Sequence, residues 1–167
     1  MSSSGKGQML VHSINDAEKA WKNATLNMRG DRIKVIIEEF INFKFEITLL
    51  TVRQKNSPTI FCSPIGHTQK DGDFIESWQP AMIKEKLLLE ARNIAKNVTD
   101  DLGGYGVFGV EFFVTKDEVI FSELSPRPHD TGMVTMFSQD FSQFDLHVRA
   151  MLGPVSYTHL TLPTMFE

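Results

Sequence analysis

The chain has 167 residues, a length typical of a single domain. Hydrophobic residues make up 41% and charged residues 23%, as in soluble globular proteins. The net charge of −4 argues against general nucleic-acid binding, and no apolar run approaches the roughly 20 residues of a membrane span. The only cysteine, Cys62, excludes an internal disulfide and fits a reducing compartment.

A glycine-rich segment, SSSGKGQ, occupies residues 2–8. The backbone N–H groups of such a loop, together with Lys6, can contact phosphates, although the segment does not match the P-loop pattern. A flexible terminus or the remnant of a tag would have the same composition. The segment alone therefore leaves both interpretations open.

A short helix is predicted over residues 13–24. Ser13 followed by Asp16 resembles a capping box, and apolar residues recur at helical spacing, which places Trp21 on a core-facing side. Residues 29–32, RGDR, predict a turn. No chemistry is expected from this region.

Three runs rich in β-branched and aromatic residues predict strands at 35–41, 45–52 and 59–65. A polar loop with some strand character follows, and its His67 could be a ligand or a base, or simply structural or exposed. Pro80 predicts the start of a long helix, because proline is favoured in the first turn, and Gly103 predicts its end. The apolar stripe of this helix indicates packing on the sheet.

A β-hairpin is predicted within residues 106–132, GVFGVEFFVTKDEVIFSELSPRPHDTG, with strands at 107–114 and 119–124. If residues 116–118 form a three-residue loop, Glu111 lies opposite Glu123. Opposed side chains on paired strands are about 5 Å apart, and like charges there repel. A shared proton or a bound cation relieves that repulsion, and Mg²⁺ is typically held by one or two carboxylates plus substrate phosphates.

The hairpin therefore indicates a Mg²⁺ site that awaits a nucleotide. The alternative is that both glutamates face water on an exposed sheet face. The assumed register decides between them, because a slip of one residue sends the two side chains to opposite faces.

Apolar positions from Phe144 to Met151 predict a last helix that ends before Gly153 and Pro154. The composition then changes. Residues 156–164, SYTHLTLPT, look like a translated adapter or cloning scar, so we expect residues 154–167 to be a non-native tail. An ordinary final strand is the alternative.

Several long stretches carry a family resemblance: SSSGKGQ, VIIEEFINFKFEITLLTV, SPIGHTQKDGDFIESWQP, LGGYGVFGVEFFV and EVIFSELSPRPHDTGMVT. They resemble the formate-dependent phosphoribosylglycinamide formyltransferases of purine biosynthesis, which are ATP-grasp enzymes. The resemblance implies an α+β fold in which antiparallel sheets are flanked by helices. It implies that residues 1–153 form a partial ATP-grasp domain without the family's N-terminal and C-terminal domains.

The resemblance also implies the site residues. Those that would contact ATP phosphates are Ser3, Ser4, Gly5, Lys6, Gly7 and Gln8. Those that would hold the adenine and ribose are Glu38, Glu39, Phe40, Ile41 and Glu46. Glu111 and Glu123 would bind Mg²⁺, and Asp130 would contact the glycinamide substrate. The EEFI sequence at 38–41 departs from the glycine-containing version of the family, and Ser125 stands where many relatives have a metal-binding asparagine.

The implied reaction begins when formate attacks the γ-phosphate of ATP to give formyl phosphate, which the amine of phosphoribosylglycinamide then attacks. Arg127, beside the hairpin, is a candidate helper for the anionic intermediate. The resemblance implies a cytoplasmic homodimer with small-molecule substrates and no nucleic-acid or membrane partner, while this chain alone is expected to be inactive. The alternatives are a carboxylating ATP-grasp ligase of purine biosynthesis and a non-catalytic nucleotide-binding module.

Overall fold

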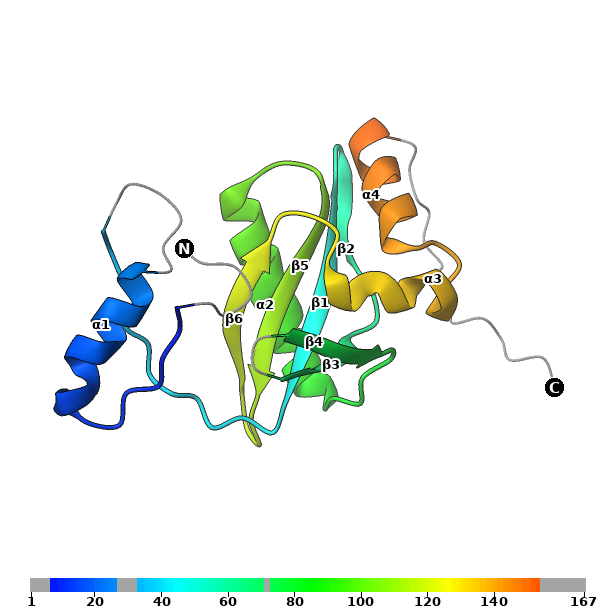
Figure 1. Cartoon of the computed structure of the whole chain (residues 1–167). Coiled ribbons are helices and arrows are strands. Elements are labelled where there is room, and N and C mark those ends of the chain that lie inside the picture. Colours follow the sequence, from blue (N-terminus) through cyan, green and yellow to red (C-terminus); the bar gives the residue numbers. More distant parts are fainter. Residues whose placement is uncertain (1–6, 27–32, 71–72, 154–167) are drawn as a thin grey trace. The chain divides into compact units, whose positions relative to one another are not determined.

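The computed structural model describes residues 7–26, 33–70 and 73–153 (Figure 1). The chain divides into two compact units, one of residues 1–42 with 69–74 and one of residues 43–68 with 75–167. The predicted turn at 29–32 and the predicted tail at 154–167 lie outside the described residues.

The first unit contains a 3₁₀ turn, η1 (Ile14–Asp16), followed by α1 (Ala17–Leu26). The predicted cap is confirmed, because the Asp16 carboxylate accepts the Ser13 N–H at 3.2 Å. The predicted core face is wrong: α1 has no buried residue, and Trp21 is 47% exposed.

Residues 33–42 form neither helix nor strand, so the strand predicted at 35–41 is also wrong. Ile36 and Ile37 are exposed there. A β-branched composition favours a strand only where a neighbouring strand or core supplies the contacts, and none pairs with this segment among the described residues.

Six strands of the described chain form one sheet in the order β4-β3-β1-β5-β6, with β2 also paired to β1. Their bounds are β1 (Phe45–Gln54), β2 (Ser57–Phe61), β3 (Ile65–Lys70), β4 (Asp73–Trp78), β5 (Gly106–Val114) and β6 (Val119–Ser125). β1 pairs antiparallel with β2, β3 and β5, and β5 pairs antiparallel with β6. The strand predicted at 59–65 is thus divided between β2 and β3. The predicted α+β class with an antiparallel sheet is confirmed.

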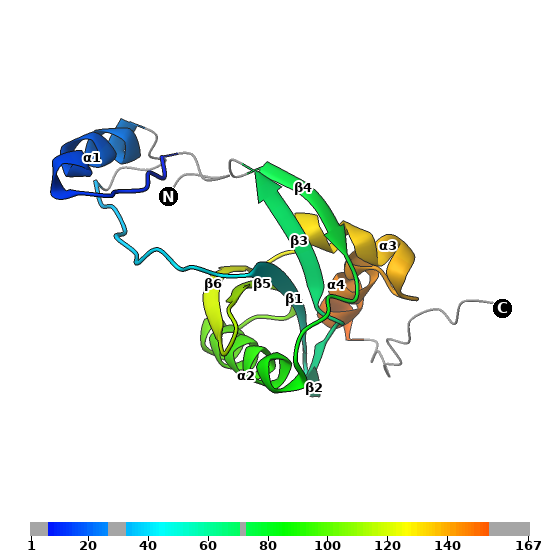
Figure 2. The ribbon, with the colours of Figure 1, turned by 90° about the horizontal axis from the view of Figure 1, so that it is seen from below.

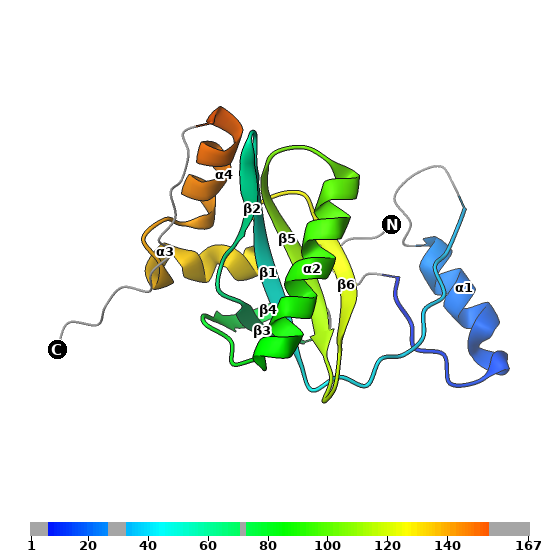
Figure 3. The same cartoon turned by 180° about the vertical axis from the view of Figure 1, so that it is seen from behind.

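Helices cover both faces of the sheet. Figure 3 shows α2 (Glu85–Leu102) in front of β1, β5 and β6, with α4 (Gln143–Leu152) beside β2, and Figure 2, from below, shows α2 and α4 on different sides of β1. Buried residues recur every four positions along α2, so one helix face packs on the sheet. β1 lies between the layers and is buried along most of its length, the hydroxyl-bearing Thr48 and Thr51 included.

The long helix begins at Glu85 rather than at Pro80. The Ala81 N–H donates to the Pro64 carbonyl at 2.7 Å, which ties the chain after Pro80 to the segment before β3. Gly103, with φ of 79°, ends the helix as predicted. No helix in the described part of the chain is long and apolar enough to cross a membrane.

The hairpin places Glu111 opposite Glu123, as predicted, but the turn and the strand pairing that produce this register differ from the predicted ones. The pair nearest the turn is Val114 with Val119, so the turn holds four residues rather than three. The ladder shifts by one residue between Glu111 and Phe112, where Ser122 is the extra residue of a β-bulge. The longer turn and the bulge offset each other.

Candidate functional site

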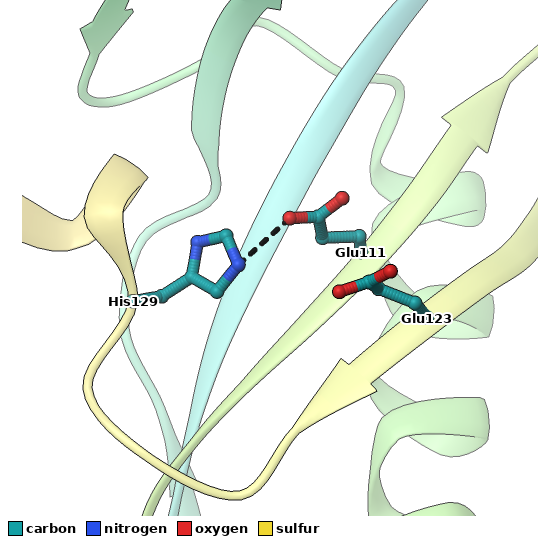
Figure 4. Close-up of side chains that lie close together, drawn as sticks. All are labelled: Glu111, Glu123 and His129. Atoms are coloured by element: carbon teal, nitrogen blue, oxygen red, sulfur yellow. Dashed lines mark ion pairs between the residues drawn. The ribbon is translucent and has the colours of Figure 1, made fainter. Parts of the chain in front are cut away.

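Three side chains meet on the sheet face that lies away from α2: Glu111 of β5, Glu123 of β6 and His129 from the loop after β6 (Figure 4). One ligand atom from each lies within 4.8 Å of the other two. His129 Nε2 donates to Glu111 Oε1 at 2.8 Å. Two carboxylates and an imidazole can hold a divalent cation, and the carboxylates suit a hard ion such as Mg²⁺.

The two glutamates differ in environment. Glu111 is 8% exposed, whereas Glu123 is exposed to solvent. Burial on its own raises the pKa of Glu111, but the hydrogen bond and charge of His129 more than offset this, with help from His67 and Arg127, so the pKa of Glu111 lies below its usual value. Glu111 therefore stays ionised in a buried position, as a cation ligand must.

Close packing holds His129 beside Glu111. A Cβ on Gly109 of β5 would lie 2.9 Å from three atoms of the His129 side chain, so only glycine leaves room for the ring there. Gln143, at the start of α4, accepts the His129 N–H at 2.8 Å and donates to the His129 carbonyl at 2.8 Å. The amide thus fixes the loop backbone on both sides of the histidine.

Two threonine hydroxyls connect His129 to a second buried histidine. His129 Nδ1 lies 2.9 Å from Thr131 Oγ1, and the Thr131 hydroxyl donates to Thr48 Oγ1 at 2.8 Å. Thr48 Oγ1 lies 3.3 Å from Nδ1 of His67. His67, which the sequence left among several possibilities, is on β3 and only 2% exposed, and burial lowers its pKa.

Glu46 of β1 lies in register with His67 on one side and Phe113 on the other. It is two residues from Thr48, which pairs with Glu111, so strand alternation places Glu46 on the same sheet face as the three side chains. Burial raises the pKa of Glu46, and the charge of Glu111 adds to this effect. A neighbouring cation would favour its ionised form.

The remaining predicted residues of the second unit border this face. Arg127 is exposed and donates from Nη1 to the Pro128 carbonyl at 2.8 Å, while its charge lowers the pKa of Glu111. Asp130 is exposed and begins the 3₁₀ turn η2 (Asp130–Val134), directly after His129. The short helix α3 (Thr135–Ser138) follows η2.

The predicted adenine-binding residues Glu38, Glu39, Phe40 and Ile41 belong to the first unit and lie in its non-regular segment. Of the predicted phosphate loop, Gly7 and Gln8 are described, and Gly7 has a φ of 88°, which favours glycine. Ser3, Ser4, Gly5 and Lys6 lie outside the described residues. These assignments stay predictions.

Sequence reasoning missed His129. It lies in the PRPHD motif, which was interpreted only through Asp130 and Arg127. The sequence did offer a signal: a histidine after two prolines, a few residues beyond a carboxylate that is a candidate metal ligand, is a candidate partner for that carboxylate.

Known proteins resemble this chain over most of its length. A family model described as the ATP-grasp domain matches residues 1–144. A curated relative from Nostoc sp. (strain PCC 7120), formate-dependent phosphoribosylglycinamide formyltransferase, is 69% identical over 153 residues, which are 92% of this chain and 39% of the relative. The chain thus spans about two fifths of the length of that relative.

Solved structures agree with the fold. A structure of glycinamide-RNase-transformylase T from Mycobacterium tuberculosis is 39% identical, with a TM-score of 0.65, covering 70% of this chain and 37% of the other. A carboxyaminoimidazole ribonucleotide synthase from Aspergillus clavatus, complexed with ATP, is 26% identical, with a TM-score of 0.85, covering 97% of this chain and 41% of the other. With the family model matched over residues 1–144, the chain belongs to the ATP-grasp family.

Proposed function

We propose that this chain forms the Mg²⁺- and ATP-binding part of an enzyme that formylates phosphoribosylglycinamide with formate. The observation that carries the proposal is the opposed pair Glu111 and Glu123, held with His129 on one sheet face of an ATP-grasp chain. The 69% identity to the Nostoc relative supports formate and phosphoribosylglycinamide as substrates.

Glu111 and Glu123 would hold Mg²⁺, and their ligand atoms fit such an ion because they lie within 4.8 Å of each other and of His129. When bound, Mg²⁺ would neutralise charge on the ATP phosphates. His129 keeps one oxygen of Glu111 in place by its hydrogen bond. Glu46 would accept from the ribose hydroxyls, and residues 38–41 and 3–8 would hold the adenine and the phosphates.

The proposed chemistry has two steps. A formate oxygen bonds to the γ-phosphorus while the bond to the β-phosphate oxygen breaks, which gives formyl phosphate and ADP. The substrate amine then bonds to the formyl carbon, the carbon–oxygen bond to phosphate breaks, and the nitrogen loses a proton. Arg127 would hold the anionic formate or formyl phosphate, and Asp130 would orient the amine through a hydrogen bond.

A chimera tests this function. Residues 1–153 replace the matching segment of the Nostoc relative, and ADP release is measured with formate and phosphoribosylglycinamide together and with each omitted. ADP release that requires both substrates supports the proposal. A folded chimera without formate-dependent release contradicts it.

A second candidate is a carboxylating ligase, because the TM-score of 0.85 to the Aspergillus clavatus synthase exceeds the 0.65 to the transformylase structure. The same chimera decides between the two. ADP release stimulated by bicarbonate plus aminoimidazole ribonucleotide, and not by formate, would favour the ligase.

We further propose that the full-length enzyme works on these small molecules in the cytoplasm as a homodimer, without nucleic-acid or membrane partners. The family resemblance supports this. Residues 154–167 are proposed to take no part in the function, because their composition departs from the rest of the chain.

A further inference from the structure

The hydrogen-bonded row from His129 to His67 is buried throughout. The exposed fractions are 9% for His129, 2% for Thr131, 0% for Thr48 and 2% for His67. A buried polar group without a hydrogen-bond partner costs free energy of folding. Removal of one of these four side chains is therefore expected to leave its neighbour in the row with an unmade hydrogen bond. The row joins three parts of the second unit: the loop after β6, the central strand β1 and the strand β3.

The row controls the orientation of the His129 ring. Glu111, as a carboxylate, only accepts, so Nε2 of His129 carries the hydrogen of that contact. Nδ1, on the other side of the ring, lies 2.9 Å from the Thr131 hydroxyl oxygen and also accepts the Thr131 backbone N–H at 3.4 Å. A ring flipped about its axis would lose both contacts together.

Thr48 anchors this arrangement to the sheet. It pairs with Glu111 across β1 and β5, and its hydroxyl accepts from Thr131 at 2.8 Å. A hydroxyl can donate one hydrogen bond and accept others, so Thr48 can serve both Thr131 and His67. β1 therefore pairs with the strand that carries Glu111, and through Thr48 it also holds the hydrogen bonds that reach His129.

We propose that Thr131 and Thr48 are positioning residues whose hydroxyls fix the His129 ring with Nε2 on Glu111, and so keep this glutamate ready to bind Mg²⁺. The inference rests on the proposed metal role of Glu111. It adds two residues that act through His129. Partners of this kind typically change metal affinity by about 10-fold to 100-fold when removed.

The experiment uses the full 167-residue chain with Thr131→Val and, separately, Thr48→Val. Valine keeps the branched shape and removes only the hydroxyl, and it is well suited to a strand at position 48. Thr131→Ser and Thr48→Ser restore the hydroxyl. The control is Thr99→Val, which removes a buried hydroxyl that donates to the Ala95 carbonyl within α2.

Two quantities are measured: the ¹⁵N resonances of the His129 ring nitrogens, and the Mg²⁺ concentration needed for ATP binding. We expect both valine variants to shift the ring resonances and to raise the required Mg²⁺ concentration by about tenfold. The serine variants should restore both quantities. Thr99→Val should lower stability and leave the His129 resonances in place.

Wild-type His129 resonances in both valine variants would overturn the inference, even if the variants were less stable. If one valine variant fails to fold, the other and the two serine variants still supply the ring resonances. If the wild-type chain shows no Mg²⁺-dependent ATP binding, the metal role of Glu111 fails. The ring resonances then still decide whether the hydroxyls orient His129.

Discussion

Glu111 combines burial with ionisation, and its neighbours explain how. It lies between the exposed carboxylate of Glu123 and the imidazole of His129 at 2.8 Å. The histidine compensates the charge that burial would otherwise disfavour. A divalent cation at the same place would compensate both glutamates at once.

A double substitution tests that role. Glu111→Gln with Glu123→Gln keeps the side-chain size and removes both charges, so Mg²⁺-dependent ATP binding, measured by calorimetry, is expected to be lost. The matched control is Glu118→Gln, at an exposed position in the hairpin turn, which should bind as the wild type does. Retained Mg²⁺ dependence in a folded double variant would refute the metal site.

His67 gives a pH prediction. Because burial lowers its pKa from 6.5, the unfolded chain binds more protons than the folded chain as the pH falls through that value. The free energy of unfolding should therefore decrease as the pH drops below about 6.5, down to the folded-state pKa.

The measurement is urea unfolding between about pH 8 and pH 5, where histidine titrates. His67→Asn should show a shallower pH dependence, whereas His12→Asn, at an exposed position of the first unit, should match the wild type. An unchanged dependence in His67→Asn would show that His67 is not the group responsible.

At the scale of residues, the sequence predicted that Glu111 lies opposite Glu123, because charged residues that interrupt apolar strands are easy to recognise. It did not predict how His129 and His67 are used. Their contacts join positions far apart in the chain, such as Thr131 with Thr48, and no local pattern encodes such contacts.

At the scale of elements, Gly109 of β5 sets how closely the loop after β6, which carries His129, can approach the sheet. A Cβ on Gly109 would meet the His129 side chain at 2.9 Å, too close for a real contact. Gly109→Ala is therefore expected to destabilise the fold by about 1–3 kcal/mol, as overpacking does. Urea unfolding measures the cost.

A second substitution identifies the source of that cost. In a His129→Gly background, which removes the three clashing atoms, Gly109→Ala should be much less destabilising. An equal cost in both backgrounds would mean that the strand itself, rather than the contact with His129, excludes alanine.

The elements also show where sequence patterns fail. β1 and β5 were predicted from their β-branched and aromatic residues, and both predictions are confirmed. Each strand is paired on both sides in the described structure, and those neighbours supply the contacts that such residues need. The segment at 35–41 has a similar composition but no pairing strand, and it stays irregular. Propensity predicts a strand, and pairing decides whether it forms.

At the scale of the whole molecule, the predicted site residues are divided between two units. Glu46, Glu111, Glu123, Arg127 and Asp130 belong to the second unit, and residues 38–41 with Gly7 and Gln8 belong to the first. The chain also spans only 39% of the Nostoc relative. The proposed function therefore depends on more residues than the carboxylate pair.

We predict that the isolated 167-residue chain gives no ADP release that depends on formate and phosphoribosylglycinamide. The full-length Nostoc relative, assayed in parallel, is the positive control. Substrate-dependent release by the purified chain would refute the prediction and show that these residues suffice for the chemistry.

The bulge at Ser122 allows β6 to have one residue more than β5 between the turn and the glutamates while Glu123 still lies opposite Glu111. With Ser122 removed, Glu123 would follow Phe121 directly, and continuing the regular ladder beyond the pair of Phe112 with Phe121 would still bring it opposite Glu111. Removal of Ile120 instead would also leave a regular ladder with Glu123 opposite Glu111, but Phe121 would move from its place opposite Phe112 to the place opposite Phe113, and so to the other sheet face. In an alignment of such hairpins, a one-residue gap anywhere from 119 to 122 is therefore compatible with opposed glutamates, and a gap at 122 is the one that also keeps Phe121 opposite Phe112.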